Sequence, residues 1–163
     1  MGKHKIRWAA ATAVAATAGI IAASVAAGAP PAAAATKSAF VIGFMNSTQG
    51  AVQFPGISDG AQAAVQYVNA RGGINGHPLV LAVCDTDTTP EKNQACAQQF
   101  ANDPRLKMVN VGFTLTPGPF YSALTPSGLP VIQSFPTTQA DFNAPNAVAY
   151  NGGAPASTVG GAE

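Results

Sequence analysis

The segment from Asp59 to Leu79 constrains the fold more than any other part of the chain. It reads DGAQAAVQYVNARGGINGHPL. Its apolar residues follow the i, i+3, i+4, i+7 spacing of a helix with one apolar face: Ala61, Ala64, Val65 and Val68. We expect Ser58 or Asp59 to cap this helix, and Gly72-Gly73 to end it in the left-handed conformation. A tight turn then leads into an apolar strand.

Apolar strands flank this helix on both sides. Residues 40–44 precede it and residues 79–83 follow it, so the unit is β-loop-α-turn-β, which predicts a parallel sheet. The rest of the chain continues the alternation. We expect a helix from Thr89-Pro90 to about residue 102, a strand at 106–111, a short helix at 120–124, a strand at 129–132 and a fifth strand at 147–150.

Several motifs agree in order with one known family. They are the run between Gly50 and Gly56 after the first strand, the turn NARGGINGHPL, Cys84-Asp85 at the end of the second strand, and GLPVIQSFPTT at residues 128–138. On these motifs the chain resembles the leucine/isoleucine/valine-binding protein family. These are type I periplasmic binding proteins, the substrate-capturing parts of ABC transporters. The resemblance runs from about residue 40 to about residue 150.

The resemblance implies a fold and a role. The fold is α/β: a three-layer lobe with a parallel sheet in the flavodoxin-like strand order 2-1-3-4-5. The family has two such lobes, and residues 36–150 match the N-terminal one, truncated before the second. The implied role is capture of a small polar ligand, such as a branched-chain amino acid, for an ABC permease in the membrane. The alternative is a truncated single-lobe fragment with no tight ligand binding of its own.

The first 35 residues have the pattern of a signal peptide. Lys3, Lys5 and Arg7 precede an uncharged stretch at residues 8–28, and small alanines precede Thr36. We therefore expect cleavage near Ala35 and a secreted or periplasmic protein. An uncleaved membrane anchor is the alternative, since the apolar stretch is long enough to span a bilayer. The junction has no cysteine for a lipoprotein anchor.

Charge and length narrow the function classes. After residue 35 there are five Lys and Arg and seven Asp and Glu, so the net charge is 5 − 7 = −2. This balance offers no basic patch for nucleic acid. The remaining 163 − 35 = 128 residues are enough for one core. Residues 151–163 are rich in Gly and Ala without an apolar period, and we expect them to be disordered.

Cys84 and Cys96 are the only cysteines. Export favours pairing, and a strand end lies within reach of the helix that packs back over it, so we predict a disulfide. Two buried free thiols are the alternative. A metal site is disfavoured because only His77 is available as a further ligand after residue 35.

Ligands of open parallel sheets bind beyond the carboxyl ends of the strands. Three loops lie there: residues 46–54, 112–119 and 134–138. They contain hydroxyls, amides and bare backbone but no carboxylate, lysine or histidine. Such groups suit hydrogen bonding to a small ligand and not acid-base catalysis, so we expect no catalytic residues and no enzyme. A secreted flavodoxin-like enzyme is the disfavoured alternative.

The resemblance assigns ligand contacts to two of these loops. They are Thr114 and Thr116 after the third strand, and Phe135, Pro136 and Thr137 after the fourth. The family often has a serine-rich run after its third strand, whereas Leu115 and Pro117 here lack hydroxyls.

We expect no cofactor and no metal. Asp85-Thr86-Asp87 lacks the later glycine and glutamate of a calcium loop, and is interpreted as a helix-entry turn. The glycines at residues 72–76 follow a helix and precede a strand, the reverse of a dinucleotide-binding motif.

Overall fold

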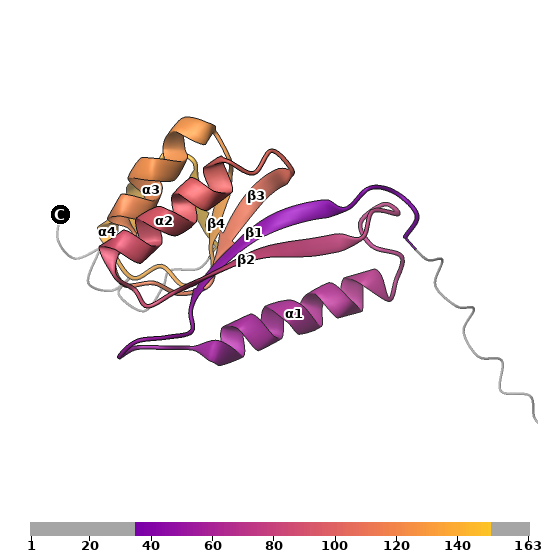
Figure 1. The fold of residues 1–163 in the computed structure, drawn as a ribbon, viewed down its shortest axis with the longest axis horizontal. Helices are drawn as coiled ribbons and strands as arrows, with labels where there is room; N and C mark the ends of the chain where they lie inside the picture. Colours follow the sequence, from indigo (N-terminus) through magenta and orange to yellow (C-terminus); the bar gives the residue numbers. More distant parts are fainter. Residues whose placement is uncertain (1–34, 151–163) are drawn as a thin grey trace, which may run out of the picture. The chain divides into compact units, whose positions relative to one another are not determined.

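The computed structural model describes residues 35–150 of the chain, all within one compact unit (Figure 1). The predicted signal peptide at residues 1–35 lies outside the described residues except for Ala35. The predicted disordered tail at residues 151–163 lies outside them entirely.

Strands and helices alternate through the described residues. Their order is β1 (Phe40–Ser47), α1 (Pro55–Asn69), β2 (Leu79–Thr86), α2 (Pro90–Ala101), β3 (Leu106–Val111), α3 (Gly118–Leu124), a 3-10 turn η1 (Thr125–Ser127), β4 (Val131–Gln133), α4 (Gln139–Asn143) and β5 (Ala147–Ala149). All neighbouring strands pair in parallel, in the order β2-β1-β3-β4-β5. This confirms the predicted fold class and strand order.

The strand order determines which helices cover which face. The chain passes from β1 to β2 in one direction along the sheet, and from β2 to β5 in the other. Right-handed crossovers therefore place α1 on one face and α2 and α3 on the opposite face. Figure 1 shows this three-layer arrangement, with α1 alone below β1 and β2. The direction reverses between β1 and β3, which makes their carboxyl ends the natural place for a ligand crevice.

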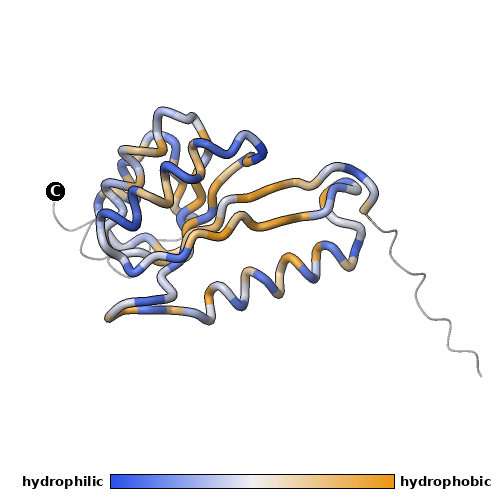
Figure 2. Tube along the Cα trace, in the orientation of Figure 1, coloured by the Kyte–Doolittle hydropathy of each residue, from blue (hydrophilic) through white to orange (hydrophobic). Residues whose placement is uncertain are grey.

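The hydrophobic core lies between the sheet and the α2–α3 layer. Its buried members come from three strands and two helices: Val41, Met45, Cys96, Ala97, Phe100, Leu106, Val109, Val111, Phe120, Tyr121, Leu124 and Val131. In Figure 2, the paired strands β1 and β2 form long hydrophobic stretches of the trace, whereas hydrophobic and hydrophilic segments alternate along α1. On the opposite face, α1 has no fully buried residue. The α1 face is therefore the less densely packed side of the sheet.

Helix α1 begins earlier than the sequence indicated. It starts at Pro55, and its N-cap residue Phe54 makes no side-chain capping bond. The prediction that Ser58 or Asp59 caps the helix is wrong: the Ser58 hydroxyl instead accepts a hydrogen bond from Asn46 Nδ2 at 2.9 Å. Proline suits the first helical position because its fixed φ is helical and it has no N–H to satisfy. That signal outweighs the absence of a capping side chain.

The end of α1 agrees with the prediction. Gly72 and Gly73 have φ values of 91° and 73°. The Gly73 N–H donates to the Val68 carbonyl at 3.0 Å, which closes the last turn. The following turn also uses left-handed backbone, at Asn75 and Gly76, before the chain enters β2.

Two elements near the C-terminal side differ from expectation. Strand β4 begins at Val131 rather than at residue 129, because Leu129 and Pro130 form the approach to the strand. Helix α4 was not predicted. It is a five-residue helix with a capping box in which Thr138 and Asp141 each bond the other's backbone N–H.

The predicted pairing of the two cysteines is confirmed. Cys84 at the end of β2 and Cys96 in α2 form a disulfide, with their Cα atoms 5.7 Å apart. The bond connects an edge strand to the helix that packs over the sheet.

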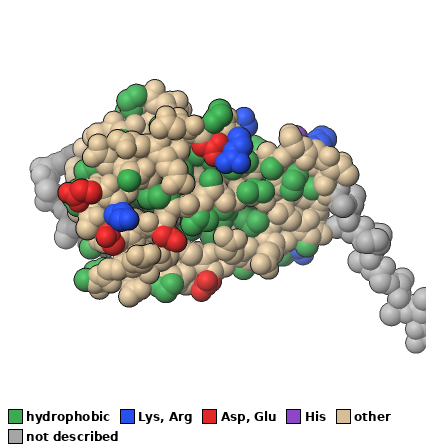
Figure 3. Space-filling view, viewed as in Figure 1, with side chains coloured by type: hydrophobic (Ala, Val, Ile, Leu, Met, Phe, Trp, Pro, Cys, Tyr) green, Lys and Arg blue, Asp and Glu red, His purple; other side chains and the backbone are tan. Residues whose placement is uncertain are grey.

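Surface charge is sparse. Figure 3 shows hydrophobic side chains gathered across the middle of the face in view, with charged side chains of both signs scattered around them. Val80 and Val83 of the edge strand β2 are among the exposed apolar residues. Within residues 35–150, no helix has the length and apolar character needed to cross a membrane.

Candidate functional site

The three predicted loops meet at the carboxyl edge of the sheet. The Ser47 N–H donates to the Phe113 carbonyl at 3.0 Å, which connects the loop after β1 to the loop after β3. The Thr137 hydroxyl donates to the Thr114 carbonyl at 2.8 Å, which connects the loop after β3 to the loop after β4. Segments that are up to ninety residues apart in the sequence therefore form one continuous rim.

The loop after β1 is held by two side chains that sequence reasoning did not single out. Asn46 is fully buried, and its amide donates to the Phe54 carbonyl and to the Ser58 hydroxyl, both at 2.9 Å. The Ser47 hydroxyl donates to the Val52 carbonyl at 2.7 Å. These bonds fix the loop against the first turn of α1, and so fix the position of Phe54 at the rim.

Asn93 of α2 organises the loop after β3. It is fully buried, and its Nδ2 lies 2.8 Å from the Thr114 hydroxyl and 3.0 Å from the Thr116 hydroxyl. Its Oδ1 accepts from the Thr86 hydroxyl at 2.7 Å. The Thr116 hydroxyl in turn donates to the Thr88 carbonyl. The two threonines assigned by resemblance are thus brought together, and both hydroxyls already have partners within the protein.

Asp141 organises the loop after β4. It is fully buried, and one carboxylate oxygen accepts from the N–H groups of Thr137 and Thr138 at 2.8 and 2.9 Å. The other oxygen accepts from Gln133 Nε2 at 2.6 Å and from the Tyr121 hydroxyl at 2.9 Å. Burial, with the adjacent carboxylate, raises the pKa of Tyr121 well above its usual value, so this hydroxyl stays protonated and donates.

Neither organising residue was predicted, although each has a weak sequence signal. Asn93 lies inside a helix, where asparagine is unfavourable unless its side chain has partners. Asp141 is the third residue after Thr138, which is the spacing of a capping box.

The remaining residues assigned by resemblance differ in exposure. Pro136 is buried, Phe135 is 39% exposed, and Thr137 is partly buried. Thr114 is fully buried below the rim, and Thr116 is partly buried. Of the five, Phe135 therefore offers the largest accessible surface.

The predicted helix-entry role of the Asp85-Thr86-Asp87 segment agrees with the geometry. Asp87 Oδ1 accepts from the Thr89 hydroxyl at 2.6 Å and from the Thr89 N–H at 3.0 Å. These bonds hold the pKa of the Asp87 carboxyl below its ordinary value. Among the described residues, no three His, Cys, Asp or Glu side chains are grouped closely enough to hold a metal ion.

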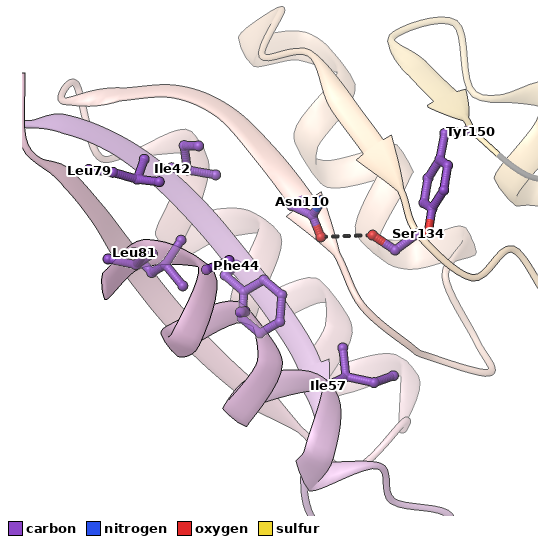
Figure 4. Close-up of a pocket in the computed structure, with 11 residues that line it drawn as sticks. Ile42, Phe44, Ile57, Leu79, Leu81, Asn110, Ser134 and Tyr150 are labelled. Atoms are coloured by element: carbon purple, nitrogen blue, oxygen red, sulfur yellow. Dashed lines mark hydrogen bonds between the residues drawn. The ribbon is translucent and has the colours of Figure 1, made fainter. Parts of the chain in front are cut away.

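The cavities among the described residues include two that are candidates for a ligand site. The larger is an open groove of about 380 Å³ between α1 and the sheet (Figure 4), lined by residues that include Ile42, Phe44, Val65, Leu81, Asn110 and Ser134. Figure 4 shows the Ser134 hydroxyl bonded to Asn110 Oδ1, at 3.0 Å. The smaller is a slot of about 60 Å³ lined by Phe54, Ile57, Phe113 and Phe135.

The smaller cavity is the better candidate for a ligand site. The groove runs along the face of the sheet that α1 covers, where no residue of α1 is fully buried. The slot lies where the loops after β1, β3 and β4 meet, at the reversal in strand order that favours ligand binding in open α/β sheets. The slot is lined by three phenylalanine rings and one isoleucine, which suit apolar contact with a ligand.

Solved structures with the same fold include three solute-binding proteins. A branched-chain amino acid transporter substrate-binding protein from Streptococcus pneumoniae, in complex with isoleucine, is 21% identical with a TM-score of 0.60. An ABC transporter substrate-binding protein from Desulfitobacterium hafniense, in complex with leucine, is 22% identical with a TM-score of 0.54. A solute-binding protein of an ABC transporter from Rhodopseudomonas palustris, in complex with 3,4-dihydroxybenzoic acid, is 18% identical with a TM-score of 0.52.

These matches cover 67%, 68% and 68% of this chain, and 32%, 33% and 31% of the respective structures. The chain therefore matches about a third of the length of each of these proteins. No curated protein matches it significantly. The family model described as periplasmic binding protein matches residues 39–163. The family indicated by the sequence motifs is thereby confirmed, and the chain belongs to the periplasmic binding proteins.

Proposed function

We propose that the chain is an extracytoplasmic solute-binding protein of an ABC importer, and that it binds its solute at the rim formed by the loops after β1, β3 and β4. The observation that carries this proposal is the rim itself, at the strand-order reversal of a chain that belongs to the periplasmic binding proteins. The three solved relatives are substrate-binding or solute-binding proteins of transporters, two of them ABC transporters, and each is in complex with a small organic solute, which supports the same partner class here.

Within the rim, we assign the solute contacts to the loops that carry Thr116, Phe135 and Thr137. Thr114 and Pro136, which the resemblance also implicates, lie buried beside them and support these loops. Branched-chain amino acids are the first ligand class that we propose, because two relatives are bound to isoleucine and leucine. The relative bound to 3,4-dihydroxybenzoic acid extends the class of possible solutes to aromatic acids.

We further propose that the N-terminal 35 residues direct export and are removed near Thr36. The basic start, the uncharged stretch and the small residues before Thr36 support this. Mass spectrometry of the exported protein should give an N-terminus within a few residues of Thr36. Recovery of the intact N-terminus in the membrane fraction would favour the anchor instead.

The transport role is tested by uptake in the cells that produce the protein. Deleting the gene should lower the uptake of at least one radiolabelled solute among leucine, isoleucine, valine, phenylalanine and benzoate, and restoring the gene should recover it. A matched sugar, such as glucose, should enter at the same rate in both strains. Unchanged uptake of all five solutes would contradict the transport role for these ligand classes.

A further inference from the structure

The slot at the rim is built from aromatic rings. The Phe54 and Phe113 ring centroids are 4.6 Å apart in an edge-to-face arrangement, and the Phe113 and Phe135 centroids are 5.9 Å apart. Ile57, in the first turn of α1, completes the lining. We call these four residues the aromatic slot. Each ring comes from a different loop, so the sequence gives no local sign of the cluster.

Exposure divides the aromatic slot into a floor and two walls. Phe113 is only 5% exposed and forms the floor, whereas Phe54 is 46% exposed and Phe135 is 39% exposed. Covering an exposed phenylalanine ring with a partner is favourable, because it removes a large apolar area from water. Two such rings on either side of a buried third ring present an apolar surface, against which the flat ring of a ligand can pack.

The hydroxyls of Thr114, Thr116 and Thr137 in the same rim are already engaged in hydrogen bonds. The hydroxyls of Thr116 and Thr137 donate to the carbonyls of Thr88 and Thr114, and the Thr114 hydroxyl accepts from Asn93. None of the four slot residues is charged. A solute that meets this surface therefore gains most from apolar and ring contacts, and less from hydrogen bonds to threonine side chains.

We propose that the aromatic slot binds the ring of an aromatic solute, such as L-phenylalanine or a benzoate. This inference rests on the proposed function, since it names the solute class for the same rim. Aromatic rings pack with centroids about 4.5–7 Å apart in edge-to-face or offset arrangements, which matches the spacing already present among the three phenylalanines. A ring that enters between Phe54 and Phe135 completes this packing, whereas a short aliphatic chain contacts fewer ring edges.

The test uses the purified 163-residue chain and saturation-transfer difference NMR, which detects weak binding. The probes are L-phenylalanine, benzoate, L-leucine and L-alanine at equal concentrations. Phenylalanine and benzoate should show the strongest saturation, centred on their ring protons. Phe135→Ala should weaken their binding by about tenfold, which is the scale of losing one ring contact and its buried area. Phe135→Leu should retain part of it.

Phe142→Ala is the matched control. Phe142 is 36% exposed, close to Phe135, but it belongs to α4 and is not part of the aromatic slot. Its substitution should leave binding unchanged. Circular dichroism shows whether each variant is folded, and Phe54→Ala replaces Phe135→Ala if the latter does not fold.

The outcomes separate the two proposals. If leucine or alanine binds as well as phenylalanine, or if Phe135→Ala and Phe142→Ala have equal effects, the aromatic slot is not the solute site, and the proposed function is unaffected. If the folded chain binds none of the four probes at millimolar concentration, solute binding by this chain is itself contradicted, and the slot assignment with it.

Discussion

Gly73 shows how a single residue fixes the connection between α1 and β2. Its φ is +73°, and a Cβ at this position would lie 2.0 Å from the His77 carbonyl oxygen. An alanine would therefore need both a strained backbone and a displaced turn. We predict that Gly73→Ala lowers the free energy of unfolding by more than about 2 kcal/mol, since the left-handed conformation alone costs about 1–2 kcal/mol. Urea unfolding followed by circular dichroism measures this change.

Gly60 provides the matched control for that substitution. It lies inside α1, and a Cβ there would meet nothing within 4 Å. Gly60→Ala should raise the free energy of unfolding by about 0.5–1 kcal/mol, because alanine is the better helix former. Equal effects of the two substitutions would contradict the role assigned to Gly73.

Asp141 is the second residue with a testable local role. Its two carboxylate oxygens accept hydrogen bonds from Tyr121, Gln133, Thr137 and Thr138. Asp141→Asn replaces one acceptor oxygen by an NH₂ group that faces these donors. We predict a loss of about 2–3 kcal/mol in the free energy of unfolding, since buried groups would then lack partners. Tyr121→Phe removes only one donor and should cost less, about 1 kcal/mol. A smaller loss for Asp141→Asn than for Tyr121→Phe in the same urea titration would refute this account.

What the sequence predicted at this scale depended on local chemistry. Gly72, Gly73 and Thr89 act through their own backbone or through neighbours a few residues away, and their roles as helix ends were predicted. Asn93 acts through Thr114 and Thr116, more than twenty residues further along the chain. Such a role has no local pattern, because it arises only when the sheet brings the loops together.

At the scale of elements, the disulfide joins β2 to α2. Within residues 35–150, the edge strand β2 pairs with one strand, β1, and its outer edge makes no backbone hydrogen bonds to another strand. The Cys84–Cys96 bond attaches it to the helix layer as well. We predict that the double substitution Cys84→Ala and Cys96→Ala lowers the free energy of unfolding by about 2–3 kcal/mol, the gain expected for closing a short loop.

The control for the disulfide is chemical reduction. Dithiothreitol should destabilise the unsubstituted protein by a similar amount and should leave the doubly substituted protein unchanged in urea unfolding. Recovery of two alkylatable thiols from natively exported protein would show that the bond is not formed there.

The strands and long helices were predictable because each carries its own period or caps. Strand β3 and helix α2 agree with the predicted residues to within one position. The start of α1 and the whole of α4 were missed. Both depend on short signals, a proline at the first helical position and a capping box, that compete with ordinary loop chemistry.

At the scale of the whole molecule, the strand order predicted which loops lie together but not which side chains they present. The reversal in strand order at β1 predicted that the loops after β1, β3 and β4 lie at one edge of the sheet, and these loops do meet. The aromatic slot was not predictable, because Phe54, Phe113 and Phe135 are neighbours only in the folded chain. Only Phe135 was singled out from the sequence.

The binding strength of the 163-residue chain follows from the shape of this rim. Sites that bind small molecules well bury about 70–90% of the ligand surface. The aromatic slot is shallow, about 60 Å³, and both of its walls remain more than a third exposed. A ligand seated there would keep much of its surface in water. We therefore predict a dissociation constant of about 1 mM for phenylalanine and a larger one for leucine, because the apolar area buried in the slot contributes little more than the free energy that association costs.

Isothermal titration calorimetry of the monomeric chain measures this affinity, with size-exclusion chromatography and light scattering to establish that it is a monomer. Thr137→Ala is the informative variant, because its hydroxyl supports the loop after β3 through the Thr114 carbonyl and lies beside Phe135 in the sequence. A micromolar complex of the monomer would show that this single rim encloses the ligand, against the prediction. If such a complex survived Thr137→Ala unchanged, the ligand would lie away from the loop after β4, because loosening that loop would otherwise displace the wall on which the ligand rests.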